Sequence, residues 1–170
     1  MVILFNGRGQ LGEKLQSLKS IEINKDIIIY HTWIVTHNSQ NAENEDIQKN
    51  EFEKFKKCVD ENPNKRIIFI STNSNRNSFY TKYKELSEAY LLHNHSDGII
   101  LKFPAFIGKG ILKKLKSGEY KPFGTLELVT LDYVVNTISE YINETEYSKR
   151  VYFISGEKIL ATTVLEILKL

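Results

Sequence analysis

The stretch IIFISTNSNRNSFYTKYKELSEAY, residues 67–90, contains an apolar run, a polar segment and the start of a periodic segment. Residues 67–70 are four consecutive apolar residues, rich in β-branched side chains, and a Ser/Asn cluster follows them. Such a run predicts a strand that is buried on both faces, as in a parallel sheet. Ser71 and Thr72 therefore stand at the carboxyl end of this strand.

From Tyr80 onward the apolar residues recur with a helical period, so Tyr80 and Lys84 share one face of a helix. A nearby ammonium favours the ionised form of a phenol, whose ordinary pKa is about 10, and so suits it to acid/base chemistry. A Thr72 hydroxyl close by can orient a substrate oxygen. The alternative interpretation is that Tyr80 and Lys84 form an ordinary exposed pair on a helix.

Length and composition predict one domain spanning residues 1–170, with a core large enough for independent folding. The net charge of +2 is too small to indicate nucleic acid or an anionic membrane as a partner. Cys58 is the sole cysteine, which excludes an internal disulfide and a cysteine-rich zinc site. No apolar run approaches the roughly 18 residues that span a bilayer. We therefore expect a cytoplasmic protein without a metal.

A glycine-rich turn follows the first apolar run, residues 2–5. Gly7, Gly9 and Gly12 match the pattern G-x-G-x-x-G and precede a segment of helical period. In a strand-turn-helix unit this pattern lets the backbone approach a pyrophosphate at the helix amino terminus. The sequence thus indicates a dinucleotide site, and a tight turn without a ligand is the alternative.

The acidic residue that reads the ribose of NAD should lie about 20 residues beyond these glycines. It is absent, because residues 27–42 contain no Asp or Glu. Arg8, inside the turn, could instead face the 2′-phosphate of NADP, although a solvated arginine explains it equally well. The choice between NADP and NAD therefore leans to NADP.

The remaining patterns predict alternating strands and helices. Strands are expected at 27–30, 98–103, 125–131 and 151–154, and helices at 47–59, 113–116, 132–142 and 162–170. In the second of these helices the lysines form a solvent face or a phosphate patch. The alternation predicts a reduced Rossmann-like α/β fold of three layers, with a mainly parallel sheet and a site at the carboxyl ends of the strands.

Together these features resemble the short-chain dehydrogenase/reductase superfamily. The likeness follows the chain in order, from the segment FNGRGQLG (5–12) through the Ser-Thr pair and Tyr80-x-x-x-Lys84 to KFPAFIG (102–108). It is greatest to the extended branch of sugar-nucleotide epimerases, dehydratases and reductases, and within that branch to the dTDP-4-dehydrorhamnose reductases.

The resemblance implies an NAD(P)-dependent oxidoreductase or epimerase that acts on a sugar nucleotide or a similar hydroxyl or carbonyl compound. Tyr80 would be the proton donor or acceptor, Lys84 would lower its pKa and hold the nicotinamide ribose, and Thr72 would bind the reacting oxygen. The hydride would belong to the cofactor. A homodimer formed through the helices flanking Tyr80 is also implied. The residues that would bind the cofactor are Gly7, Arg8, Gly9, Gln10, Leu11, Gly12, Ser71, Lys84 and Pro104.

The sequence departs from the extended branch in several places. The unit with the second and third strands, which holds the adenosine half of the cofactor, is absent or reduced to residues 20–25. Thr32 and Trp33 stand where small residues border the pyrophosphate. Thr72 and Tyr80 are separated by eight positions, 80 − 72, a short loop for this branch. The rival hypothesis is therefore a catalytically inactive relative that serves as a binding or regulatory protein.

Overall fold

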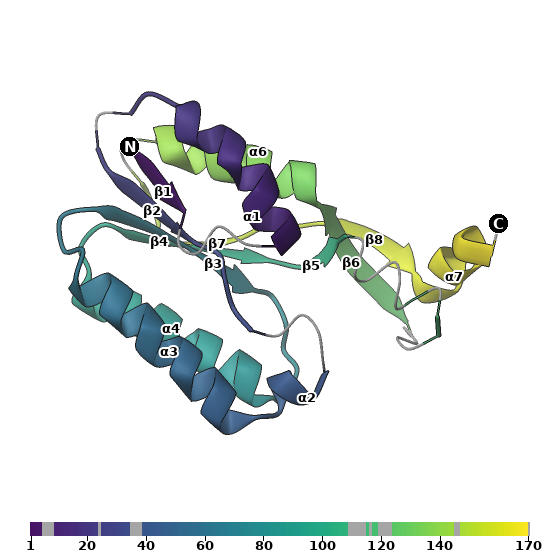
Figure 1. Cartoon of the computed structure of the whole chain (residues 1–170). Coiled ribbons are helices and arrows are strands. Elements are labelled where there is room, and N and C mark those ends of the chain that lie inside the picture. The colour runs from purple at the N-terminus through teal and green to yellow at the C-terminus, as the bar shows by residue number, and fades with distance from the viewer. Residues whose placement is uncertain are drawn as a thin grey trace.

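The computed structural model describes residues 1–4, 9–23, 25–34, 39–108, 115, 117–118, 124–144 and 147–169 (Figure 1). Its strands are β1 (Val2–Leu4), β2 (Ile27–Tyr30), β3 (Arg66–Thr72), β4 (Gly98–Phe103), β5 (Ala105–Ile107), β6 (Thr125–Thr130), β7 (Val151–Phe153) and β8 (Glu157–Leu160). Its helices are α1 (Gly9–Leu15), the 3₁₀ helix η1 (Gln16–Ser20), α2 (Ser39–Ala42), α3 (Glu45–Asp60), α4 (Phe79–Asn94), α6 (Leu131–Asn143) and α7 (Ala161–Lys169).

The main sheet has five strands in the order β1-β2-β3-β4-β7, and every neighbouring pair is parallel. Helices α1 and α6 cover one face, and α3 and α4 cover the other (Figure 1). This arrangement confirms the predicted reduced Rossmann-like fold with three layers and a parallel sheet.

The continuous apolar strands are explained by burial on both faces. Along β3, Ile68 and Ile70 pack with α1 and α6, whereas the alternate residues Ile67 and Phe69 pack with α3 and α4. All four are at most 4% exposed. Cys58 of α3 is likewise buried. Among the described helices, none is both long enough and apolar enough to cross a membrane.

Strand β1 lies at one edge of the main sheet, directly beside β2. Three helices connect neighbouring strands of the main sheet: α1 joins β1 to β2, α3 joins β2 to β3, and α4 joins β3 to β4, so each step moves the same way across the sheet. However, α1 lies on the opposite face of the sheet from α3 and α4. The crossover through α1 therefore has the opposite hand, although parallel crossovers almost always share one hand. A chain that has lost the strands between α1 and β2 would return in this way. In a full dinucleotide fold those strands lie on the outer side of β1.

A second sheet of order β5-β6-β8 lies beyond the carboxyl end of β4, with α7 after it (Figure 1). The sequence predicted β6 and α7 but neither β5 nor β8. β5 pairs parallel with β6, and β8 pairs antiparallel with it. The predicted basic helix at 113–116 lies outside the described residues, apart from Leu115.

Candidate functional site

The candidate site is built where α4 begins beside the end of β3. Ser78 is the N-cap of α4, and its hydroxyl accepts a hydrogen bond from the backbone N–H of Thr81 at 3.2 Å. This cap satisfies one of the free N–H groups at the helix start. It also sets Tyr80 in the first turn of α4, next to the carboxyl end of β3.

The Thr72 hydroxyl lies near the Tyr80 phenol and lowers its pKa, so the structure places the two predicted hydroxyls close together. Tyr80 is half-buried. Burial raises the pKa of Tyr80 to about 12, with Thr72 lowering and the charge of Glu88 raising it. This direction is opposite to the one predicted from the sequence, because the loss of solvent outweighs the lowering by Thr72. The phenol is therefore protonated at neutral pH.

Lys84 is buried, with 3% of its surface exposed. Its Nζ donates a hydrogen bond to the backbone oxygen of Ile70 at 2.7 Å and lies 4.4 Å from the ring centroids of both Trp33 and Phe69. Burial lowers the pKa of Lys84 to about 7, against the opposing charges of Glu88 and Glu51. The interpretation as an ordinary exposed pair on a helix is therefore wrong for Lys84.

Trp33 follows β2 and covers the ammonium of Lys84. Its indole N–H donates to Oε1 of Gln48 at 2.6 Å, and the amide of Gln48 in turn donates to the backbone oxygens of Ile34 and Asn41. Gln48 is completely buried and Trp33 is 9% exposed. A polar side chain of α3 thus fixes the indole against Lys84, a contact that sequence analysis missed.

Ser71, predicted to bind a cofactor, donates a hydrogen bond to Oε1 of Glu88 on α4. The other oxygen of Glu88 accepts from Nζ of Lys102 on β4 at 2.9 Å. Both charged side chains are largely buried, at 13% and 14% exposure. Sequence spacing could place Glu88 on the face of Tyr80 and Lys84, but it could not reveal its partners.

The glycine turn is described in part. Gly7 and Arg8 lie outside the described residues. Gly9 has a φ of +79°, a left-handed conformation that favours glycine, and a Cβ added there would meet nothing within 4 Å. Gln10 contacts the segment after β5, since its Oε1 lies 2.7 Å from where a Cβ on Gly108 would be. Leu11 and Gly12 are buried.

Pro104 links β4 to β5 and is half-buried. It follows Phe103, the register partner of Thr72, so it stands at the same edge of the sheet as the hydroxyl pair. The carboxyl ends of β3 and β4 thus carry Ser71, Thr72 and Pro104, and α4 brings Tyr80 and Lys84 to the end of β3.

Asn73 supplies an acceptor at this edge that sequence analysis missed. Its amide nitrogen donates to the backbone oxygen of Ile154 at 3.0 Å. Its side-chain oxygen is buried and has no hydrogen-bond partner among the described residues. Buried polar atoms normally have a partner, and the carboxamide of a nicotinamide has N–H groups that could provide one.

The two ends of a nicotinamide dinucleotide fit this structure differently. The nicotinamide end fits the donor and acceptor set of Thr72, Asn73 and Tyr80. At the adenosine end, β1 is the outermost described strand of the main sheet, whereas a dinucleotide normally lies across a crevice with strands on both sides. Within the described ranges, no three His, Cys, Asp or Glu side chains are grouped as a metal site requires.

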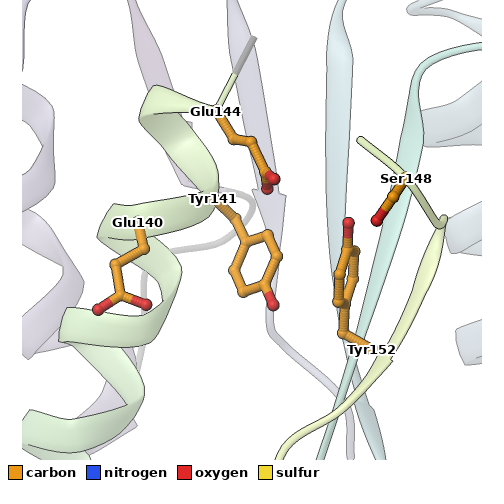
Figure 2. A pocket seen from close by; sticks show the side chains of 5 residues that line it. All are labelled: Glu140, Tyr141, Glu144, Ser148 and Tyr152. Carbon is orange, nitrogen blue, oxygen red and sulfur yellow. The ribbon is translucent and has the colours of Figure 1, made fainter. Parts of the chain in front are cut away.

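A separate cavity of about 410 Å³ lies between α6 and β7, away from these residues (Figure 2). The rings of Tyr141 and Tyr152 lie side by side there, with their centroids 4.5 Å apart and their planes tilted by 54°. Its lining residues are Glu140, Tyr141, Glu144, Ser148 and Tyr152. None of the predicted site residues is among them, so we place the candidate site at the strand ends and not in this cavity.

No protein-family model matches this sequence, and no curated protein matches it. Several solved structures, in contrast, match this chain. A dTDP-glucose 4,6-dehydratase from Streptomyces venezuelae, solved with NAD and TYD bound, is 13% identical with a TM-score of 0.76, over 98% of this chain and 79% of that one. A dTDP-4-dehydrorhamnose reductase from Bacillus anthracis, in complex with NADP, is 13% identical with a TM-score of 0.74, over the same two shares.

A UDP-N-acetylglucosamine 4-epimerase from Methanobrevibacter ruminantium, in complex with UDP-N-acetylmuramic acid, is 16% identical with a TM-score of 0.73, over 98% of this chain and 80% of that one. At such identities the likeness establishes the fold. By their names, these similar structures are a reductase, a dehydratase and an epimerase of sugar nucleotides.

Proposed function

We propose that this protein is an NAD(P)-dependent oxidoreductase or epimerase acting on a sugar nucleotide or a similar hydroxyl or carbonyl substrate. The observation that supports this most directly is the closeness of the Thr72 and Tyr80 hydroxyls at the carboxyl edge of the sheet, with the buried Lys84 one turn further along α4. The names of the similar solved structures, which include complexes with NAD and NADP, agree with it.

Tyr80 acts in this proposal as the proton donor to a substrate oxygen. A pKa of about 12 keeps its phenol protonated at neutral pH, which suits the reduction of a carbonyl better than the oxidation of an alcohol. Thr72 holds the same oxygen through its hydroxyl. A bound nicotinamide would supply the hydride to the carbon while Tyr80 supplies the proton to the oxygen.

The remaining predicted residues would hold the cofactor. Gly9, Gln10, Leu11 and Gly12, with Gly7 and Arg8 before them, would border the pyrophosphate. Lys84, Ser71 and Pro104 would border the nicotinamide ribose and ring. Arg8 leads us to propose NADP before NAD. The single domain over residues 1–170 and the homodimer through the helices flanking Tyr80 are proposed with it.

A turnover assay with Tyr80→Phe tests this proposal. The protein is incubated with NADPH or NADH and a panel of 4-keto and 4-hydroxy derivatives of dTDP and UDP sugars, and products are separated by chromatography. We expect Tyr80→Phe to lose at least about 100-fold in kcat, the usual size of a proton-transfer contribution. Tyr133→Phe, at a residue 48% exposed on α6, is the control and should keep full turnover. Full turnover by Tyr80→Phe would refute the role of Tyr80 as the proton donor.

A second candidate function is a family relative that binds a partner without catalysis. Two observations favour it. β1 has no described strand on its outer side, where the adenosine half would be held. The ammonium of Lys84 is bonded to Ile70 and covered by Trp33. The two functions differ in one requirement, since an enzyme of this kind must bind a nicotinamide dinucleotide and a non-catalytic partner need not.

A further inference from the structure

One face of α4 is attached to the last three residues of β3. Tyr80, Lys84 and Glu88 follow one another at intervals of four residues, so their side chains form a row along the helix. Each member of the row lies beside a different residue of the strand end, and two of the three are hydrogen-bonded to it. The hydrogen-bonded pairs are Lys84 with the backbone oxygen of Ile70 and Glu88 with Ser71, and Tyr80 lies near Thr72.

Glu88 is the member of this row that is fixed at both ends. Ser71 donates to one carboxylate oxygen and Lys102 to the other. Ser71 and Lys102 are register partners on the neighbouring strands β3 and β4, so the sheet itself sets the spacing of the two donors. A largely buried carboxylate with both oxygens bonded in this way has little freedom to move.

We propose that Glu88 is a positioning residue of the candidate site, whose fixed carboxylate, four residues beyond Lys84 on the same face of α4, favours the ammonium form of Lys84 over the neutral amine. This role rests on the proposed function, in which the Lys84 ammonium attracts a charged group of the ligand and a neutral amine would not. The charge state of Lys84 can nevertheless be measured without any cofactor.

The surroundings of Lys84 make such a charge necessary. Beside it lie the ring of Phe69 and the backbone oxygen of Ile70 from β3, and the ring of Trp33 from the segment after β2. Glu51 of α3 is the other acidic group that acts on Lys84, and Lys102 of β4 faces Glu88. Burial lowers the pKa of Lys84, and the carboxylates of Glu88 and Glu51 raise it, with the larger effect from Glu88.

The test is the titration of the Lys84 side chain by NMR, in protein labelled with ¹³C at the lysine ε carbon. The signal is assigned by its loss in Lys84→Met. In Glu88→Gln, which keeps an oxygen that can accept from Ser71, the midpoint should fall by about one pH unit, the low end of the effect of a neighbouring opposite charge. Glu85→Gln, an exposed change on the same helix, is the matched control and should leave the midpoint in place.

Two further variants separate this role from a structural one. Glu88→Asp keeps the charge and should return the midpoint toward the wild-type value. Lys102→Met removes the cation that faces Glu88 and should raise the midpoint of the Lys84 titration, the opposite of the shift expected for Glu88→Gln. This variant tests the proposal if Glu88→Gln does not fold. An unchanged midpoint in folded Glu88→Gln or in Lys102→Met would overturn the proposal. Because no cofactor is added, a failure of the proposed function would leave these results unaffected.

Discussion

We expect the stability of the wild-type protein to rise between about pH 7 and pH 9, and replacing Lys84 by Met should abolish this rise. Lys84 is 3% exposed, and burial lowers the pKa of its ammonium from 10.5 to about 7. Between these two values the unfolded chain binds nearly one proton more at this position than the folded chain. The free energy of unfolding therefore increases as the pH rises through this window.

The size of the effect follows from the same displacement of the pKa. A difference of one bound proton changes the free energy of unfolding by about 1.4 kcal/mol per pH unit. Between about pH 7, where the Lys84 ammonium of the folded protein is half titrated, and about pH 9, the free energy of unfolding should increase by about 2 kcal/mol. Domains of this kind unfold with about 5–15 kcal/mol in total, so the change is large enough to measure.

Urea unfolding at three pH values, followed by circular dichroism, is the assay. Lys82→Met is the matched control, because it removes the same side chain from the same helix at a position 58% exposed. We expect the wild type and Lys82→Met to gain stability alike as the pH rises, and Lys84→Met to show no such gain. An equal slope in Lys84→Met would refute the reasoning, since another group would then be responsible.

Three further predictions concern the scaffold. Burial alone would raise the pKa of Asp97, but a hydrogen bond from Lys25 and the charge and hydrogen bond of Arg66 hold this pKa below its usual value. Asp97→Asn should therefore cost about 2 kcal/mol in urea unfolding at neutral pH, and its difference from wild type should shrink below about pH 4. Burial raises the pKa of the Cys58 thiol to about 11, so the thiol of the folded protein should react slowly with a disulfide reagent such as DTNB and become labelled on unfolding. Rapid labelling of the native protein would contradict this. A Cβ at Gly98 would lie 2.6 Å from Cγ of Leu91, so Gly98→Ala should lower stability by about 1–3 kcal/mol, and an unchanged melting temperature would contradict the crowding.

The sequence predicted the strands and helices of the main sheet because each has a strong local signal. The apolar run at 67–70 became the centre of β3, and the helical period after Tyr80 became α4. β5 and β8 were missed because they are short and form only through pairing with β6, which lies more than 15 residues away from each. Local pattern contains no information about such distant pairs.

The candidate site was predictable to the same degree. Spacing placed Tyr80 and Lys84 on one face, and the strand end brought Thr72 beside Tyr80. Spacing did not show which face of α4 is buried, so it allowed an exposed Lys84 and predicted a lowered pKa for Tyr80. The partners that fix the site, Gln48 for Trp33 and Lys102 for Glu88, lie 15 and 14 residues away in sequence and meet only through the tertiary fold.

Titration with NADPH and with NADH tests the central claim most directly. Trp33 is the sole tryptophan of the chain and its ring lies 4.4 Å from the Lys84 ammonium, so its fluorescence reports on the site itself. We expect a saturable change in Trp33 emission and in nicotinamide fluorescence, together with a stabilisation of about 2.7 kcal/mol at 100 times Kd. No change in either signal and no rise in melting temperature at millimolar cofactor would contradict the enzymatic account and favour the non-catalytic one.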